Sequence, residues 1–86
     1  YIIIMYNKET AYVMITCEPD SEGIVLDKIR SIECVKDAII TYGNYDIVAE
    51  IEIESIESLR DVIIHNIRKI KNIRCTTTLM CQNGHT

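Results

Sequence analysis

The stretch Thr-Tyr-Gly-Asn-Tyr-Asp, residues 41–46, lies between two runs that are typical of β-strands, VKDAII before it and IVAEIEI after it. The Gly-Asn pair at its centre joins the two residue types that most readily accept positive φ angles, so the stretch predicts a tight hairpin turn. Two tyrosines flank the turn, and the carboxylate of Asp46 follows at once. Two interpretations stay open: a plain hairpin whose aspartate caps its own turn, or a small-molecule site with exposed amides, one acid and an aromatic wall.

The totals restrict the class of protein. A length of 86 residues predicts one domain, and an apolar content of 48% excludes a disordered chain. There is no Trp or Phe, so the core must be aliphatic, which suits a β-sheet. The net charge of −4 argues against a nucleic-acid surface, because phosphate binding needs clustered Lys and Arg.

The cysteines and the apolar runs indicate the compartment. Cys17, Cys34, Cys75 and Cys81 include no C-x-x-C pair, so we interpret them as reduced, strand-borne hydrophobic residues. We therefore expect no metal, no disulfide and no cofactor. No secretory leader is recognised, and no apolar run approaches the ~20 residues that cross a bilayer. The sequence therefore predicts a cytoplasmic protein with no membrane contact.

The first half of the chain predicts a strand and then a helix. Apolar residues alternate through residues 11–18, as in a strand with one buried face. Pro19 cannot lie inside a strand ladder, so it ends this strand. A helix with an apolar stripe then begins at a cap formed by Asp20 or Ser21 and continues to about Ser31.

The central and second parts predict strands around another helix. A second strand over residues 35–41 leads into the turn, and a third strand over residues 45–54 alternates most regularly of all. Ser55 is a good cap for a second helix, with Ser58 as an alternative one turn later, and the helix extends to about Ile70 with aliphatic residues at helical spacing. The last strand covers residues 73–81.

The ends of the chain depart from this pattern. We interpret residues 1–10 as an N-terminal extension, either an extra edge strand or a tail that packs on a partner. Residues 82–86 are polar and are expected to form a flexible tail. The domain itself is expected to cover residues 11–81.

The chain repeats itself with a shift of 38 residues. Residues 30–36 align with residues 68–74, and the apolar positions of the first strand and helix align with those of the third strand and second helix. A strand–helix–strand unit used twice is the split βαβ plan of the ferredoxin-like fold. We therefore predict an α+β sandwich of order βαββαβ, with a four-stranded antiparallel sheet and both helices on one face.

The other face of this sheet would be too apolar for open water. A mixed surface of this kind usually contacts another protein surface, and the simplest partner is the same face of a second copy. The sequence thus predicts a homodimer formed through the sheet. Strand alternation assigns eight residues to this face: Tyr12, Met14, Ile39, Thr41, Val48, Thr76, Thr78 and Met80.

Two segments carry a resemblance to a known family. The turn at residues 43–46, followed by Ile47-Val48-Ala49, resembles the G-x-Y-D turn in the effector-binding domain of the Lrp/AsnC transcription regulators. The strand at residues 73–79 resembles that family's closing strand, which carries a T-x-T pair. The resemblance covers residues 11–81. It implies dimers with sheets face to face, often assembled into tetramers or octamers, and an amino acid effector bound between dimers near the turn.

One departure from the family concerns DNA binding. Members usually carry an N-terminal helix-turn-helix domain, for which this chain has no room, so it resembles the stand-alone form of the domain. The resemblance then implies that the chain modulates transcription through partner proteins, which would include a full-length regulator of the family, without direct contact to nucleic acid.

The resemblance also implies which residues bind the effector. The amides of the Gly-Asn pair would hold an α-carboxylate, and Asp46 would pair with the α-ammonium. The ring of Tyr45 would form one wall of the effector site, unless it packs in the core. The two threonines would contribute hydroxyls from a neighbouring subunit, although ordinary β-propensity also explains them. The six positions are Gly43, Asn44, Tyr45, Asp46, Thr76 and Thr78.

Two other functions remain as alternatives. The same fold serves small dimeric α+β-barrel enzymes, such as monooxygenases or isomerases, which need an acid–base group in a cavity between helices and sheet. Both helix stripes here are aliphatic, His65 has no second ligand or nucleophile near it in the sequence, and His85 lies in the tail. We therefore expect no catalytic residues and no enzyme activity. A plain oligomerisation domain that binds nothing is the other alternative.

Overall fold

The computed structural model describes residues 8–81, so most of the expected N-terminal extension and the whole expected tail lie outside the described residues. The βαββαβ order predicted from the sequence is confirmed. The elements are β1 (Glu9–Cys17), α1 (Glu22–Arg30), β2 (Val35–Ile40), β3 (Ile47–Ile53), α2 (Ile56–Val62), the π-helix η1 (Ile63–Ile67) and β4 (Ile73–Met80).

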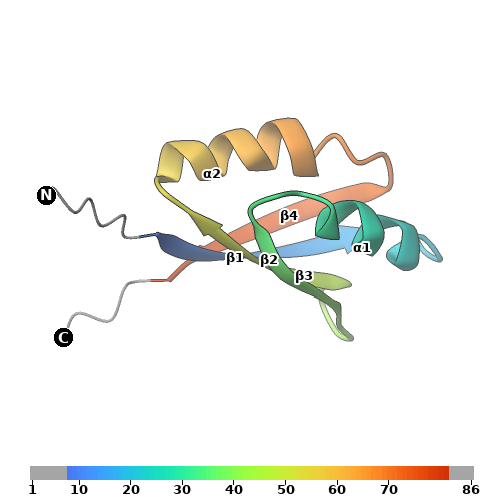
Figure 1. The fold of residues 1–86 in the computed structure, drawn as a ribbon. Coiled ribbons are helices and arrows are strands. Elements are labelled where there is room, and N and C mark those ends of the chain that lie inside the picture. Colours follow the sequence, from blue (N-terminus) through green and yellow to red (C-terminus); the bar gives the residue numbers. More distant parts are fainter. Residues whose placement is uncertain (1–7, 82–86) are drawn as a thin grey trace, which may run out of the picture.

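The sheet and helices form two layers. The strand order is β2-β3-β1-β4, and each neighbouring pair is antiparallel. Both helices lie on one face of the sheet, as expected, with α2 above β4 (Figure 1). The connection between β2 and β3 lies at the end of the sheet opposite the two chain termini (Figure 1). The predicted ferredoxin-like fold is therefore confirmed.

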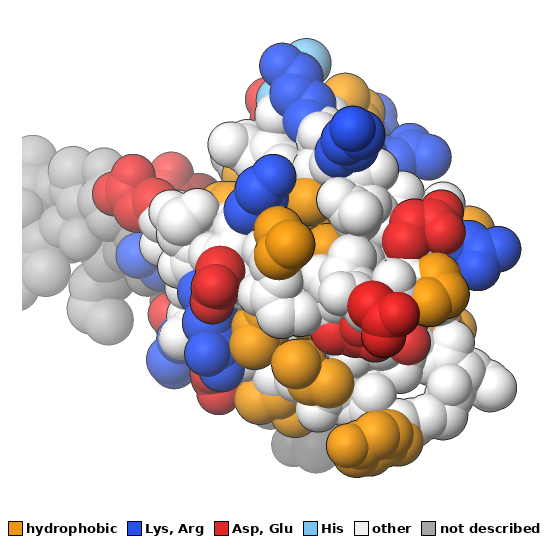
Figure 2. All heavy atoms as spheres, turned by 90° about the vertical axis from the view of Figure 1, so that its right-hand side faces the viewer, with side chains coloured by type: hydrophobic (Ala, Val, Ile, Leu, Met, Phe, Trp, Pro, Cys, Tyr) orange, Lys and Arg blue, Asp and Glu red, His pale blue; other side chains and the backbone are white. Residues whose placement is uncertain are grey.

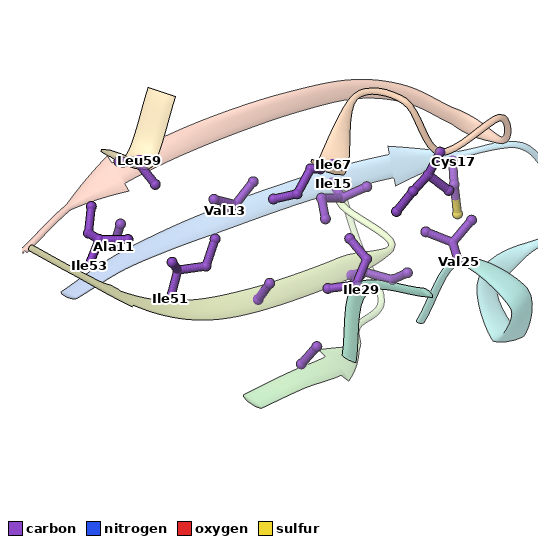
Figure 3. Close-up of a cluster of buried hydrophobic side chains, with 14 residues drawn as sticks. Ala11, Val13, Ile15, Cys17, Val25, Ile29, Ile51, Ile53, Leu59 and Ile67 are labelled. Carbon is purple, nitrogen blue, oxygen red and sulfur yellow. The ribbon is translucent and has the colours of Figure 1, made fainter. Parts of the chain in front are cut away.

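The core is aliphatic and lies between the two layers. Every second residue of β1 and β3 is buried, because alternate side chains of a strand point to the same face. The helices cover these side chains with four buried aliphatic residues (Figure 3). They are Val25, Ile29, Leu59 and Ile67.

The internal repeat is visible in the strands and extends to their irregularities. β1 and β3 begin 38 residues apart, and so do β2 and β4. One residue of β2, Lys36, has no partner on β3, and one residue of β4, Arg74, has no partner on β1. Both are therefore β-bulges, and they occupy equivalent positions of the repeat. The repeated unit thus includes a bulge with a basic residue.

The helix boundaries differ in detail from the prediction. Ser55 caps α2 as expected, because its hydroxyl accepts a hydrogen bond from Ser58 N at 3.1 Å. The Ser21 hydroxyl instead donates to Glu18 O at 2.5 Å and does not cap α1. The prediction of one continuous α-helix to Ile70 was wrong, because α2 ends at Val62 and the π-helix η1 follows it.

The bulge at Arg74 overturns one prediction about faces. Thr76 and Thr78 were assigned to the open face of the sheet together with Met80, but the register places these three opposite the core residues of β1, on the helix side. One extra residue in a strand exchanges the faces of all residues beyond it. The open face of β4 therefore carries Cys75, Thr77 and Leu79.

The corrected open face is still apolar. Met14 lies at its centre, paired with Val48 on one side and Thr77 on the other. Ile39 and Leu79 are about half exposed, at 51% and 53%. The apolar character that suggested a sheet-to-sheet dimer is thus retained with a different set of residues on β4.

Candidate functional site

The loop at residues 41–46 is wider than the tight turn predicted from its sequence. Thr41 N donates to Asp46 O at 2.8 Å, and the Thr41 hydroxyl donates to Tyr45 O at 2.8 Å. Gly43 has a φ of +119°, whereas Asn44 does not take a positive φ. Glycine is needed at this one position because a side chain there would strain the backbone.

Asp46 connects this loop to the neighbouring strand. Its amide donates to Ile15 O at 2.8 Å, and its Oδ2 accepts a hydrogen bond from Cys17 N at 2.8 Å. The interpretation that Asp46 caps its own turn is therefore wrong, since its carboxylate secures the end of β1. The side chain is half-buried, and within the described residues Oδ1 has no hydrogen bond. One carboxylate oxygen thus remains for a ligand.

The tip of the loop presents backbone amides to solvent. Gly43 and Asn44 are exposed, and their amides have no hydrogen bond to any residue of the range 8–81. Tyr42 is fully exposed, whereas Tyr45 is half-buried and holds Thr41 through its carbonyl. Two open amides therefore lie within three residues of a carboxylate, an arrangement that can hold a zwitterion.

Thr76 and Thr78 lie away from this loop. Thr76 pairs with Ile15, and Ile15 pairs with Ile47, so Thr76 is two strand spacings, about 10 Å, from the start of β3. Its side chain points to the helix side of the sheet. One protomer does not bring all six predicted residues together. They can contact the same ligand only if the threonines come from another subunit.

Thr78 lines a groove between α2 and β4, which we call the α2–β4 groove. Its volume is about 420 Å³. Sequence reasoning missed this groove because the bulge at Arg74, which turns Thr78 toward α2, was not recognised. The lining residues are Ile56, Leu59, Arg60, Ile63, Ile64, Arg68, Thr78 and Met80.

A second groove, of about 550 Å³, lies between the α1–β2 connection and α2. Carboxylates of Glu33, Glu52 and Glu54 line it together with apolar side chains. Glu52 is paired with Lys36 at 3.9 Å. Neither groove includes the loop at residues 41–46.

The described residues offer little for acid–base chemistry in the core. Of the polar side chains in residues 8–81, only Ser21 is buried, and it lies at the start of α1. No three His, Cys, Asp or Glu side chains in that range are grouped closely enough to hold a metal ion. None of the described helices is long and apolar enough to span a membrane.

The cysteines are free thiols in different environments. Burial raises the pKa of the Cys17 thiol, and the nearby carboxylate of Asp46 acts in the same direction, while the neighbouring Ser21 hydroxyl opposes them. Burial also raises the pKa of Cys34, with a further contribution from Glu33. Both thiols therefore stay protonated at neutral pH, in keeping with hydrophobic packing residues.

Comparisons with known proteins agree with this fold. The profile of the Lrp/AsnC ligand binding domain matches residues 10–84. An uncharacterised HTH-type transcriptional regulator of Pyrococcus furiosus is 30% identical over 74 residues, which are 83% of this chain and 49% of the regulator. The chain thus spans about half the length of this curated relative.

Solved structures show the same fold. AsnC of E. coli superposes with a TM-score of 0.85 at 26% identity, over 100% of this chain and 62% of AsnC. A transcriptional regulator of Neisseria meningitidis, solved as a complex with L-Met, has a TM-score of 0.83 over 100% of this chain and 60% of that one. Its identity is 8%, so this second likeness shows the fold alone.

Proposed function

Because this chain belongs to the Lrp/AsnC ligand-binding domain family, we propose that it senses a small amino acid and modulates transcription through the proteins with which it assembles. The observation that carries the proposal is the loop at residues 41–46, where two amides without a hydrogen bond in residues 8–81 lie within three residues of a carboxylate that uses one oxygen for Cys17 N. An α-amino acid carries a carboxylate that the amides can bind and an ammonium group that the carboxylate can bind. The Neisseria regulator that shares this fold was solved with L-Met, so amino acids are the ligand class to test first.

The roles of the individual residues follow from their chemistry. The amides of Gly43 and Asn44 receive the α-carboxylate, and Oδ1 of Asp46 receives the α-ammonium. Each charge-assisted hydrogen bond contributes about 1.5–3 kcal/mol, more than a neutral one. Tyr45 is half-buried, and it supports the loop through its carbonyl while its ring closes one side of the site.

The site is completed by a second subunit. Thr76 and Thr78 lie on the helix side of the sheet, so their hydroxyls reach a ligand at the loop only from a neighbouring protomer. A ligand held between subunits stabilises the assembly by mass action. Effector concentration would then set the oligomeric state or the choice of partner, including a full-length regulator of the same family.

The open face of the sheet supplies the primary dimer contact. Tyr12, Met14 and Val48 lie side by side on this face, and each remains partly exposed in the single protomer. Pairing this face with its copy about a two-fold axis removes the apolar surface from water. Tetramers or octamers then follow from contacts at the effector sites.

The proposal also concerns compartment and chemistry. The domain acts in the cytoplasm, as a regulator of transcription does, and has no enzyme activity. The absence of a buried acid–base group between helices and sheet, in the described residues, supports a binding function over a monooxygenase or isomerase.

A thermal-shift screen of the twenty amino acids tests this function. A true effector at one hundred times its Kd adds about 2.7 kcal/mol, which raises Tm by about 10 °C or more in a domain of this size. The ligand-dependent shift should disappear in Asp46→Asn and persist in Asp27→Asn, a matched change of an exposed carboxylate on α1. If no amino acid stabilises the wild type, or if Asp46→Asn keeps the full shift, the proposed site is wrong.

A further inference from the structure

The α2–β4 groove has a regular pattern along its helical wall. Ile56, Arg60, Ile64 and Arg68 all line it, and they follow one another at intervals of four residues. Because all four side chains line the same groove, isoleucine and arginine alternate along one wall, which α2 forms at Ile56 and Arg60 and η1 with its C-cap forms at Ile64 and Arg68. Ile56 and Ile64 are 57% and 44% exposed, which leaves apolar surface uncovered beside the two arginines.

The charge of this region is opposite to that of the rest of the chain. Residues 60–74 contain five of the nine Lys and Arg and one of the thirteen Asp and Glu. Figure 2 shows Lys and Arg gathered at the top of one face, over the end of the second helix. Neither Arg60 nor Arg68 forms an ion pair or a hydrogen bond within residues 8–81. Both are therefore available to an anionic partner.

The groove lies beside an edge strand of the sheet that no other described residue covers. β2 and β4 are the two edge strands, and β4 pairs with β1 alone among the described strands. On the β2 edge, Arg30 donates two hydrogen bonds to Ala38 O, at 3.1 and 2.7 Å, which blocks the addition of another strand. β4 has no such contact in the described residues, and residues 75–80 carry no charge. Within residues 8–81 of the single protomer, this edge is therefore open to an extended chain.

We propose that, in a protomer whose Thr76 and Thr78 do not serve a neighbouring effector site, the α2–β4 groove binds an extended segment of a partner protein with the pattern acidic–x–aliphatic–x–acidic, added as a strand along β4. Arg60 and Arg68 are eight residues apart, which is at most about 12 Å along the axis, because the π-helix η1 between them rises less per residue than an α-helix. Positions i and i+4 of a strand are about 13 Å apart and point to the same face. Acids at these positions reach the two arginines, and the aliphatic residue at i+2 lies against Ile64.

The chemistry favours this occupant over two others. A second copy that pairs its own β4 edge across a two-fold axis brings two sets of arginines together without a carboxylate between them. Nucleic acid would satisfy the arginines but would leave Ile56, Ile64 and Met80 against phosphate and water. An acidic peptide with an aliphatic centre satisfies the charges and covers the apolar surface together.

A synthetic peptide tests the proposal on the whole chain. The probe is fluorescein-labelled Thr-Glu-Thr-Ile-Thr-Glu-Thr with blocked ends, and the readout is fluorescence anisotropy without added amino acids. Because no effector is present, failure of the amino-acid screen does not affect this measurement, and Asp46→Asn should bind the peptide normally. The double variant Arg60→Glu/Arg68→Glu should weaken binding by about tenfold or more, since two charge-assisted contacts become repulsive.

The matched control is Lys69→Glu/Lys71→Glu, which changes the net charge equally at exposed residues outside the groove. It should weaken binding by about threefold or less, through long-range electrostatics alone. A probe with Lys in place of both Glu should bind about tenfold more weakly to the wild type. If the arginine variant does not fold, this reversed probe and the single change Ile64→Asp provide the same test.

Three results would overturn the proposal. The first is no binding of the acidic probe up to about 1 mM. The second is an equal loss of affinity in the arginine and lysine variants, which would indicate a nonspecific basic patch, such as one that binds duplex DNA. The third is unchanged amide hydrogen exchange in residues 75–80 when the probe is bound, because strand addition must protect amides of β4. The proposal is supported if the bound probe slows amide exchange in residues 75–80 and if the arginine variant alone loses affinity for the probe.

Discussion

The replacement Asp46→Ala should destabilise the domain even in the absence of a ligand. In the structure the carboxylate of Asp46 accepts a hydrogen bond from Cys17 N at 2.8 Å, between residues 29 positions apart in the sequence. This bond closes the end of β1 against the loop that precedes β3. Its removal leaves a partly buried backbone amide without an acceptor.

The size of the effect follows from the kind of bond. Hydrogen bonds to charged groups contribute about 1.5–3 kcal/mol, and because Asp46 is only half-buried we expect the lower part of that range, about 1.5–2 kcal/mol. For a domain of 60–100 residues, 1 kcal/mol changes Tm by about 4–8 °C. Asp46→Ala should therefore lower Tm by about 6–16 °C. Asp46→Asn, which keeps a neutral acceptor, should lower it by less.

The measurement is urea or thermal denaturation of the wild type and the variants at one protein concentration, because self-association makes stability concentration-dependent. Asp27→Ala is the control, since Asp27 is exposed on α1 and has no hydrogen bond from its side chain in the described residues. It should change the free energy of unfolding by less than about 0.5 kcal/mol.

Equal stability of Asp46→Ala and Asp27→Ala would refute the reasoning. The bond to Cys17 N would then contribute nothing, and Asp46 would serve only a ligand. A loss of stability together with a loss of effector binding is the expected outcome. The two effects are separable, because Asp46→Asn should recover most of the stability and little of the binding.

Three further changes have defined outcomes. Met14→Asp places a charge at the centre of the open face and should halve the mass seen in sedimentation; an unchanged mass would mean that the dimer uses another surface. Gly43→Ala should lower the free energy of unfolding by about 1 kcal/mol or more, because φ is +119° at this residue. The control is Gly23→Ala in the first turn of α1, where nothing lies within 4 Å of the added Cβ. In the same denaturation experiment this control should be neutral or stabilising. Burial raises the pKa of Cys17 and Cys34, so these thiols ionise at a higher pH in the folded chain than in the unfolded chain. The free energy of unfolding should therefore be independent of them at neutral pH and should fall as the pH rises above about 8.5. This fall should be less steep in Cys17→Ala, and an identical pH dependence of variant and wild type would contradict burial as the cause.

Local patterns were sufficient for the architecture. The alternation in residues 11–17 and 47–53 places one face of each strand in the core whatever the rest of the chain does, because the period of two is a property of the extended backbone. The 38-residue repeat then implies that the second half adopts the same strand–helix–strand order, and the structure confirms this order. The family resemblance of the loop at residues 43–46 is likewise a local feature, since a glycine is needed where φ is positive.

Contacts between distant segments decided the rest. The faces of β4 depend on its register against β1, and the bulge at Arg74 is a property of that pairing, so alternation alone placed Thr76 and Thr78 on the wrong side. The repeat did contain a signal, since Ile39 of the open face aligns with Thr77 and not with Thr76 or Thr78.

The partner of Asp46 is another such contact. Cys17 lies 29 residues earlier in the chain, and no local pattern indicates that its amide meets this carboxylate. The α2–β4 groove needs the second helix, the bulge and the sheet edge together. Periodicity acts over neighbouring residues and can be read along the chain, whereas register, groove shape and long-range hydrogen bonds exist only once the strands have paired.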